Sequence, residues 1–171
     1  MSSNRLKVLG FLALGALAGC GFAPLYGGAT GGQVSARLDE VYVATIPDRP
    51  GQVLRETLET SLQQGSAPTE QLYELDVAYT VNQQNAGIQA DSASTHARFI
   101  GTASWRLTPI GTPGQVLLAG KSTAMNAQDV VNEQYFALTL GRDTIDRQLA
   151  QDISAQITDQ LAAWFRAHPN A

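Results

Sequence analysis

The sequence predicts an α+β domain, a two-layer sandwich with two helices on one face of a mostly antiparallel four-stranded sheet. Four segments have the residue types or the two-residue alternation of β-strands, and two have the four-residue apolar spacing of amphipathic helices. These elements follow one another in the order β-α-β-β-β-α. Helices that are confined to one face of a mostly antiparallel sheet define this two-layer architecture.

The first strand and the first helix are expected on either side of a proline-rich break. Residues 38–46 are rich in β-branched and aromatic side chains, which favour a strand. Pro47 breaks the chain, Asp48 suits a helix N-cap and Pro50 suits the first turn of a helix that runs to about Gln64. The apolar stripe of this helix consists of Leu54, Leu58 and Leu62. The next strand should lie parallel to the first if the two are neighbours.

Three further strands are expected between residues 71 and 125. Residues 71–81 alternate, with one apolar and one polar face. Residues 82–95 are polar and rich in turn residues, which predicts a long hairpin or a loop, and residues 97–108 alternate again. A turn at 109–114 then leads to a strand at 115–125. The predicted inward-facing residues are Tyr73, Leu75, Val77, Tyr79, Val81, Phe99, Gly101, Ala103, Trp105 and Leu107.

A long helix is expected from about Asn132 to His168, a stretch without proline and with one glycine, Gly141. Its apolar residues recur mostly at every fourth position, and acidic and amide side chains occupy the opposite side. The apolar residues are Leu138, Ile145, Leu149, Ile153, Ile157, Leu161 and Phe165. Such a stripe is wide enough to cover a sheet.

The N-terminus has the pattern of a bacterial lipoprotein signal peptide. Arg5 and Lys7 precede an apolar stretch, residues 8–17, that is too short to span a bilayer as a helix. Residues 17–20 read Leu-Ala-Gly-Cys, a pattern that a lipoprotein signal peptidase cleaves before its cysteine, and Cys20 is the only cysteine. An ordinary secretory signal with an incidental cysteine fits less well. We therefore expect residues 1–19 to be removed and Cys20 to be lipidated, which anchors the protein. No aspartate follows Cys20, and this favours the outer membrane.

The mature chain is expected to have a lipidated, glycine-rich tether, residues 20–34, and a single domain, residues 35–168. Within the tether, Phe22–Tyr26 is apolar and lies near the bilayer surface or docks onto a partner. Cleavage leaves nine basic and 15 acidic residues, a net charge of −6, with Lys121 as the only lysine. Nucleic acid is therefore not expected as a partner, because phosphate binding requires clustered cations.

Neither catalysis nor a cofactor is expected. Asp91, Ser94 and His96 contain the residue types of a hydrolase triad, and a hydrolase is one hypothesis for the chain. No Gly-x-Ser-x-Gly motif or oxyanion-hole glycine motif accompanies them. The two histidines, His96 and His168, are far apart in the sequence and no free thiol remains, so no metal site is predicted. A glycine-rich phosphate loop between a strand and a helix is also absent from the sequence.

Three cations are the candidate binding residues. Arg98 and Arg106 lie on the polar face of one predicted strand, and Lys121 lies on the next strand. If these strands pair, the three side chains form a small cationic patch that suits a phosphorylated anionic ligand. The alternative is that Glu74 or Asp76 pairs across strands with Arg106, an interaction that is common and weak.

Two segments and the order of elements resemble the LptE family of lipopolysaccharide-assembly lipoproteins, also called rare lipoprotein B. The segment CGFAPLYG at residues 20–27 resembles the mature start of the family. The segment IPDRPGQ at 46–52, with Leu54, Arg55 and Leu58 after it, resembles the family's junction between strand and helix. The expected fold, two helices on a four-stranded sheet, is similar to the family's fold.

The resemblance implies a non-enzymatic lipoprotein of the outer membrane. Members of the family plug the lumen of the β-barrel LptD, assist its assembly and help pass lipopolysaccharide to the outer leaflet. The resemblance also implies lipopolysaccharide binding by basic residues on the sheet, which by position are Arg98, Arg106 and Lys121. A second hypothesis is an auxiliary lipoprotein of an ABC-type lipid transporter that binds or senses lipid, and it predicts an apolar cavity between sheet and helices.

Overall fold

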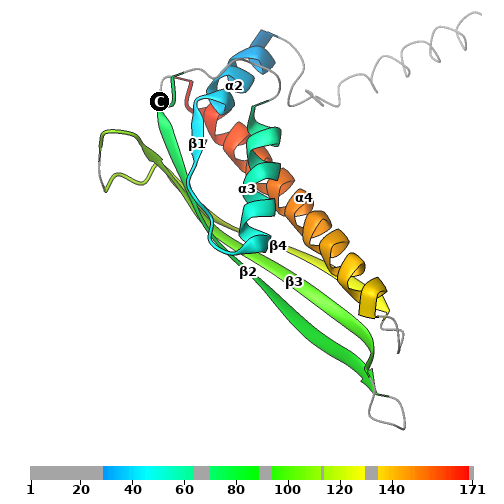
Figure 1. The fold of residues 1–171 in the computed structure, drawn as a ribbon. Coiled ribbons are helices and arrows are strands. Elements are labelled where there is room, and N and C mark those ends of the chain that lie inside the picture. The colour runs from blue at the N-terminus through cyan, green and yellow to red at the C-terminus, as the bar shows by residue number, and fades with distance from the viewer. Residues whose placement is uncertain (1–28, 64–69, 89–93, 113, 130–134, 170–171) are drawn as a thin grey trace, which may run out of the picture.

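A four-stranded sheet carries three helices on one of its faces (Figure 1). The structure is a computed structural model, and it describes residues 29–63, 70–88, 94–112, 114–129 and 135–169. The elements in chain order are α2 (Ala29–Asp39), β1 (Val41–Val43), α3 (Arg49–Leu62), β2 (Tyr73–Ile88), β3 (Ser94–Pro109), β4 (Leu118–Asp129) and α4 (Tyr135–Ala167). The α+β fold class is therefore confirmed, with one helix more than the sequence predicts.

The strands lie side by side in the order in which they occur in the chain, β1-β2-β3-β4. The short β1 pairs in parallel with the start of β2, as expected for neighbours joined through a helix, with Val41 opposite Tyr73. β2 and β3 form a long antiparallel hairpin, and β3 pairs antiparallel with β4. The polar segment at 82–95 is thus mostly strand, because β2 continues to Ile88 and β3 begins at Ser94.

The predicted alternation of faces is confirmed along β2 and β3. Tyr73, Leu75, Val77 and Tyr79 are each at most 9% exposed, whereas Ala78 between them is exposed. The inward-facing residues of β3 are also buried, namely Phe99, Gly101, Ala103, Trp105 and Leu107. One face of the hairpin therefore lies in the core and the other faces solvent.

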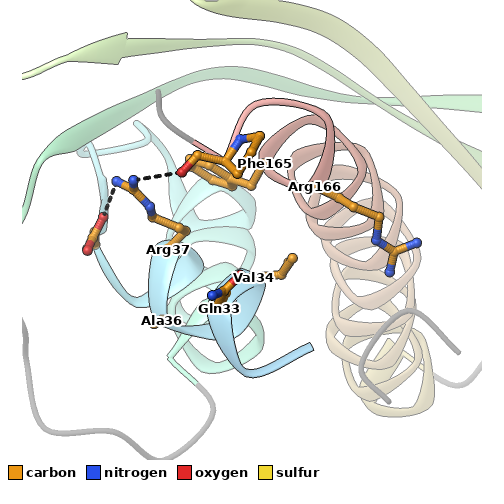
Figure 2. Close-up of a pocket in the computed structure, with 8 residues that line it drawn as sticks. Gln33, Val34, Ala36, Arg37, Phe165 and Arg166 are labelled. Carbon is orange, nitrogen blue, oxygen red and sulfur yellow. Dashed lines mark hydrogen bonds and ion pairs between the residues drawn. The ribbon is translucent and has the colours of Figure 1, made fainter. Parts of the chain in front are cut away.

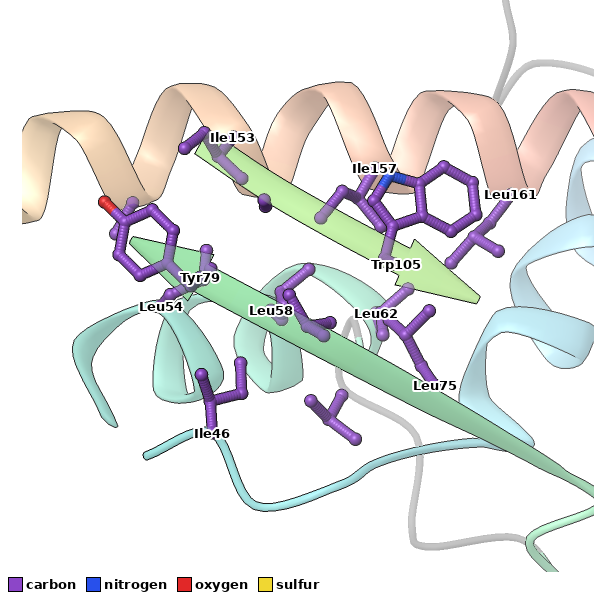
Figure 3. Packing of buried hydrophobic residues seen from close by; sticks show 14 of the residues in the cluster. Ile46, Leu54, Leu58, Leu62, Leu75, Tyr79, Trp105, Ile153, Ile157 and Leu161 are labelled. Atoms are coloured by element: carbon purple, nitrogen blue, oxygen red, sulfur yellow. The ribbon is translucent and has the colours of Figure 1, made fainter. Parts of the chain in front are cut away.

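Two helical stripes cover the inner face of the sheet (Figure 3). Leu54, Leu58 and Leu62 of α3 are no more than 1% exposed, and so are the α4 residues Leu149, Ile153, Ile157 and Leu161. A hydrogen bond of 2.9 Å joins the hydroxyl groups of Ser154 and Ser61 where the two helices meet. Aliphatic side chains from both helices and the sheet fill the space between the layers, and this burial is the main source of stability.

The junction between β1 and α3 explains the motif IPDRPGQ. Asp48 stands at the N-cap position, as predicted, but its side chain makes no capping hydrogen bond and its φ is +66°. Its carbonyl oxygen instead accepts the Gln52 N–H at 3.0 Å. Gly51 packs so closely on Ile46 that an added Cβ would lie 2.7 Å from Ile46 Cγ2. The motif therefore serves a tight turn from strand to helix.

Helix α2 occupies residues for which the sequence predicts a tether and the start of the first strand. The expected strand over 38–46 is too long, because Leu38 belongs to α2 and β1 contains only three residues. Val34 and Leu38, four residues apart, are 4% and 2% exposed and belong to the common core. Tertiary packing therefore stabilises a glycine-containing helix whose intrinsic propensity is low.

Candidate functional site: the outer face of the sheet

All three described helices lie on one side of the sheet, and none of them covers the opposite face (Figure 1). We call it the outer face. By the strand alternation, it carries Tyr42, Glu74, Asp76, Ala78, Thr80, Asn82, Gln84, Arg98, Ile100, Thr102, Ser104, Arg106, Thr108, Ala119, Lys121, Thr123, Met125 and Ala127. Most of these side chains are small or are polar without a charge, and five of them are charged, namely Glu74, Asp76, Arg98, Arg106 and Lys121.

Arg106 is neutralised by a carboxylate on the neighbouring strand. The register places Arg106 directly opposite Asp76, and Arg106 Nε lies 3.0 Å from Asp76 Oδ2. The two side chains are 61% and 37% exposed, so water screens the pair strongly. The alternative of a cross-strand ion pair is therefore realised, with Asp76 and not Glu74 as the partner.

Lys121 lies close to Arg106, whereas Arg98 lies far from both. Lys121 pairs with Ser104 and Arg106 pairs with Ala119, so the two cations are diagonal neighbours, with Cα atoms roughly 7–8 Å apart. Arg98 is eight positions along β3 from Arg106, a separation of about 27 Å. The structure therefore brings together two of the three predicted cations.

Arg98 has apolar neighbours that the sequence analysis did not connect with it. Ile100, two positions further along the same face, pairs with Met125, and Met125 is 60% exposed. A cation thus lies beside one half-buried and one exposed apolar side chain. The signal for Ile100 is in the sequence, because it is the apolar residue among the outward-facing positions of residues 98–106, whereas the weak alternation of β4 hides the orientation of Met125.

A shallow hollow of about 580 Å³ opens on the outer face around the ion pair. Its outward-facing lining includes the small side chains Ala78, Ser104 and Ala119 together with Asp76 and Arg106. Thr45, which follows β1, borders it. Small side chains and one screened ion pair suit close contact with a polar surface.

A second hollow, of about 500 Å³, lies between α2 and the C-terminal end of α4 (Figure 2). Arg37 lines it, but its guanidinium already donates to Glu40 Oε2 at 3.3 Å, to Tyr73 Oη at 3.2 Å and to the Pro169 carbonyl at 3.2 Å. These bonds tie α2 to the sheet and to the end of the chain. Arg37 is therefore a structural residue here.

A buried cluster at the other end of α4 is also structural. Arg142 Nε lies 3.2 Å from Asp146 Oδ1, and the guanidinium carbon lies 4.7 Å from the centre of the Phe99 ring. Burial, as the largest cause, and the Asp146 carboxylate together raise the pKa of Tyr79 to about 12, and Arg142 opposes both. Tyr79 is therefore neutral at physiological pH and does not act as an acid or base there.

The remaining candidates carry no described site. Ser94 and His96 lie in β3, while Asp91 and the expected lipidation residue Cys20 lie outside the described residues. No group of three or more metal-ligating side chains occurs in the part of the chain that the structure describes. Within that same part, no helix has the length and apolar character that crossing a membrane requires.

Three solved structures whose names describe lipoproteins are similar to this fold. One from Caulobacter crescentus CB15 aligns with a TM-score of 0.61 at 22% identity, covering 78% of this chain and 96% of that one. A minor lipoprotein from Acinetobacter baumannii gives 0.57 at 17%, covering 72% and 91%. Rare lipoprotein B from Shewanella oneidensis gives 0.50 at 8%, covering 75% and 93%. At these identities the likeness establishes the fold. No curated protein matches the sequence significantly.

The family follows from the sequence itself. The family model of LptE, described as lipopolysaccharide-assembly, matches residues 38–161, which is more than half of the chain. The chain belongs to the LptE family. It is thus a member of a non-enzymatic family of lipopolysaccharide-assembly lipoproteins associated with the outer membrane.

Proposed function

We propose that this protein is the lipid-anchored plug and assembly factor of an LptD-like β-barrel and aids transfer of lipopolysaccharide to the outer leaflet. The observation that carries the proposal is the outer face, a broad uncovered surface of small polar side chains on a domain that needs only its inner face for stability. The lumen of an outer-membrane barrel is polar and wet, and such a surface fits it.

The proposed anchor is Cys20, with the domain on the periplasmic side of the outer membrane. Two or more acyl chains make anchoring stable, so the domain itself need not enter the lipid. Eight residues separate Cys20 from Ala29, the first residue of α2. Fully extended, that connection reaches about 30 Å. This reach lets the domain sit within a barrel while the acyl chains remain in the surrounding bilayer.

Lipopolysaccharide contact is proposed for Arg98, Arg106 and Lys121, with unequal roles. Asp76 already pairs with Arg106, whereas no described carboxylate forms an ion pair with Arg98 or Lys121. Lipopolysaccharide is an amphiphile, so its binding requires apolar contact as well as a cation. The apolar neighbours of Arg98 provide that apolar contact. We therefore expect Arg98→Glu and Lys121→Glu each to weaken lipopolysaccharide binding more than Arg106→Glu does, with unchanged thermal unfolding.

The hypothesis of a lipid-binding transporter subunit is less well supported. It predicts an apolar cavity between sheet and helices, but Leu58, Ile153 and Ile157 are fully buried there and fill the space. A lipid chain would have to displace this core.

Affinity purification of full-length protein from native membranes, followed by mass spectrometry, tests the proposal. We expect a stoichiometric outer-membrane barrel. A Cys20→Ala variant is the matched control for anchoring, and we expect it to leave the membrane fraction. Inner-membrane transporter subunits in place of a barrel would contradict the proposal and support the transporter hypothesis.

A further inference from the structure

The two edges of the sheet differ in how far other parts of the protein bind their backbone groups. Helix α4 closes the edge at β4, because Gln156 binds the backbone of Thr123 as a neighbouring strand would. The Thr123 N–H donates to Gln156 Oε1 at 3.3 Å, and Gln156 Nε2 donates to the Thr123 carbonyl at 3.1 Å. Further along the same edge, Asn126 Nδ2 donates to Gln148 Oε1. The side-chain amides thus occupy an edge that would otherwise accept another strand.

The opposite edge, at β2, is paired only at its beginning, although Thr45, which follows β1, still lies beside Val77. β1 pairs with Tyr73–Leu75, and the Leu75 carbonyl accepts the Ala44 N–H at 3.0 Å. Because backbone groups alternate in direction along a strand, Val77, Tyr79 and Val81 also direct their N–H and C=O groups away from β3. Among the described residues, no strand pairs with these three positions on that side. We call residues 77–81 the open edge.

The open edge lacks the features that normally prevent strand pairing. Residues 77–88, VAYTVNQQNAGI, contain no proline and no charged side chain. The pairing register of β2 with β3 also runs without a bulge from Tyr73 to Ala86. Natural edges of this length are usually protected by lysine, proline, a bulge or a cover. The edge at β2 is therefore unprotected, whereas side chains of α4 cover the opposite edge at β4. This contrast indicates that the edge at β2 binds a partner strand.

We propose that the open edge is a strand-addition site that takes an extended segment of the partner barrel chain before that barrel closes. The inference rests on the proposed function and specifies how the assembly step operates. From Tyr73 to Val81 the odd-numbered positions of β2 face the core and the even-numbered positions lie on the outer face. An added strand continues both layers only if it alternates apolar and polar residues, which is the pattern of a barrel strand. A closed barrel has no free edge, so the segment is a strand that is still unpaired.

Lysine substitutions on the two edges test the proposal. Thr80 on the open edge pairs with Thr102 on β3, which in turn pairs with Thr123 on the closed edge, so the three lie in one row on the outer face. In cells that express tagged full-length protein, newly made barrel chain is pulse-labelled and captured. Because a lysine on an edge strand disfavours the addition of another strand, we expect Thr80→Lys to reduce capture at least about fivefold, an effect of the size of one net hydrogen bond. Thr123→Lys places the same charge in the same row of the outer face but at the closed edge, and it should reduce capture less than Thr80→Lys does.

A backbone substitution provides an independent readout. Proline at Val81 removes an N–H that points away from β3, so the ladder between β2 and β3 is retained. Val81→Ala removes most of the same side chain but keeps the N–H. We expect Val81→Pro to capture at least about fivefold less labelled chain than Val81→Ala. Thermal unfolding followed by circular dichroism checks that each variant is folded. If Val81→Pro does not fold, the comparison of Thr80→Lys with Thr123→Lys tests the proposal.

Three other outcomes would contradict the proposed function, the edge site or the choice of partner. If wild-type protein captures no barrel chain at any time, both the proposed function and the edge site fail. If Thr80→Lys and Thr123→Lys reduce capture equally, the outer face binds the barrel and the edge site alone fails. If the variants alter self-association in sedimentation and leave capture unchanged, the open edge pairs with a second copy of this chain and the barrel assignment fails.

Discussion

The two faces of the sheet are built from the same strands but differ in the burial and the type of their side chains. On β3, Trp105 is 3% exposed on the inner face, and its neighbour Arg106 has a side chain that is 61% exposed on the outer face. Inner-face residues are mostly apolar and pack against α3 and α4, whereas outer-face residues are mostly small or polar. We infer from this difference that folding depends mainly on the inner face, and that the outer face is therefore available to bind a partner.

The largest expected effect comes from truncating a side chain on the inner side. Leu58 is fully buried between α3 and the sheet. We expect Leu58→Ala to lower the free energy of unfolding by about 2–5 kcal/mol, because it removes apolar contacts and leaves a cavity. Urea denaturation, with the slope and the midpoint fitted together, measures the change.

Met125→Ala is the matched control on the outer face. Met125 is 60% exposed, so its truncation should change the free energy of unfolding by no more than about 0.5 kcal/mol. Equal losses for the two variants would mean that the outer face also contributes to the stability of the free protein, and the contrast between the faces would be wrong.

The sequence predicts this contrast well where the alternation is strong. Tyr73, Leu75, Trp105 and Leu107 were all placed correctly, because burial of one face imposes a strict two-residue period on an antiparallel strand. Prediction failed for α2, whose residues 29–39 include Gly31 and Gly32. Only contacts with residues distant in sequence, such as the bonds from Arg37 to Tyr73 and Pro169, favour a helix there.

The candidate site was predicted in part for a similar reason. Residue types placed Arg98, Arg106 and Lys121 on one face, but only the register separates Arg98 from the other two. The cover of the β4 edge by Gln156 was equally hidden, because a glutamine on the polar side of a helix has no local pattern that distinguishes it from a solvated one. The open edge at β2 emerges only from the shortness of β1.

A smaller effect is expected at Gly120, where β4 passes under the Trp105 ring. An added Cβ would collide with the indole carbon Cζ2 of Trp105, whose Nε1 donates to Ser122 Oγ at 3.3 Å. We expect Gly120→Ala to lower the free energy of unfolding by about 1–3 kcal/mol through overpacking. Because the substitution displaces the Trp105 ring, we also expect the tryptophan fluorescence of the folded protein to change. Ala119→Ser, one residue away on the outer face, is the control, and an equal loss there would count against the explanation.

The next effect depends on pH and concerns Tyr79. Its pKa is about 12 in the folded protein and 10.0 in the reference state. The folded pKa is the higher, so the stabilisation is complete below pH 10 and is lost as the pH rises from 10 to about 12, because the unfolded chain releases its proton first. At pH 11 the loss should be about 1.4 kcal/mol, measured by urea denaturation at pH 8 and pH 11.

Tyr79→Phe is the matched variant for this test. No described group accepts or donates a hydrogen bond to the buried Tyr79 hydroxyl, so its removal at pH 8 should be neutral or slightly stabilising. The variant should lose less stability than wild type between pH 8 and pH 11. Identical pH dependence in the two proteins would show that other groups, and not Tyr79, control unfolding in alkali.

The smallest expected effect on stability is at the outer-face ion pair of Arg106 and Asp76. A double-mutant cycle with Arg106→Ala and Asp76→Ala should give a coupling of about 0.5 kcal/mol or less, because solvent screens both groups. A coupling well above 1 kcal/mol would mean that the outer face has a structural role after all. With a small coupling, folding does not depend on the ion pair of Arg106. A loss of barrel capture or of lipopolysaccharide binding in an Arg106 variant then reports on the partner and not on the fold.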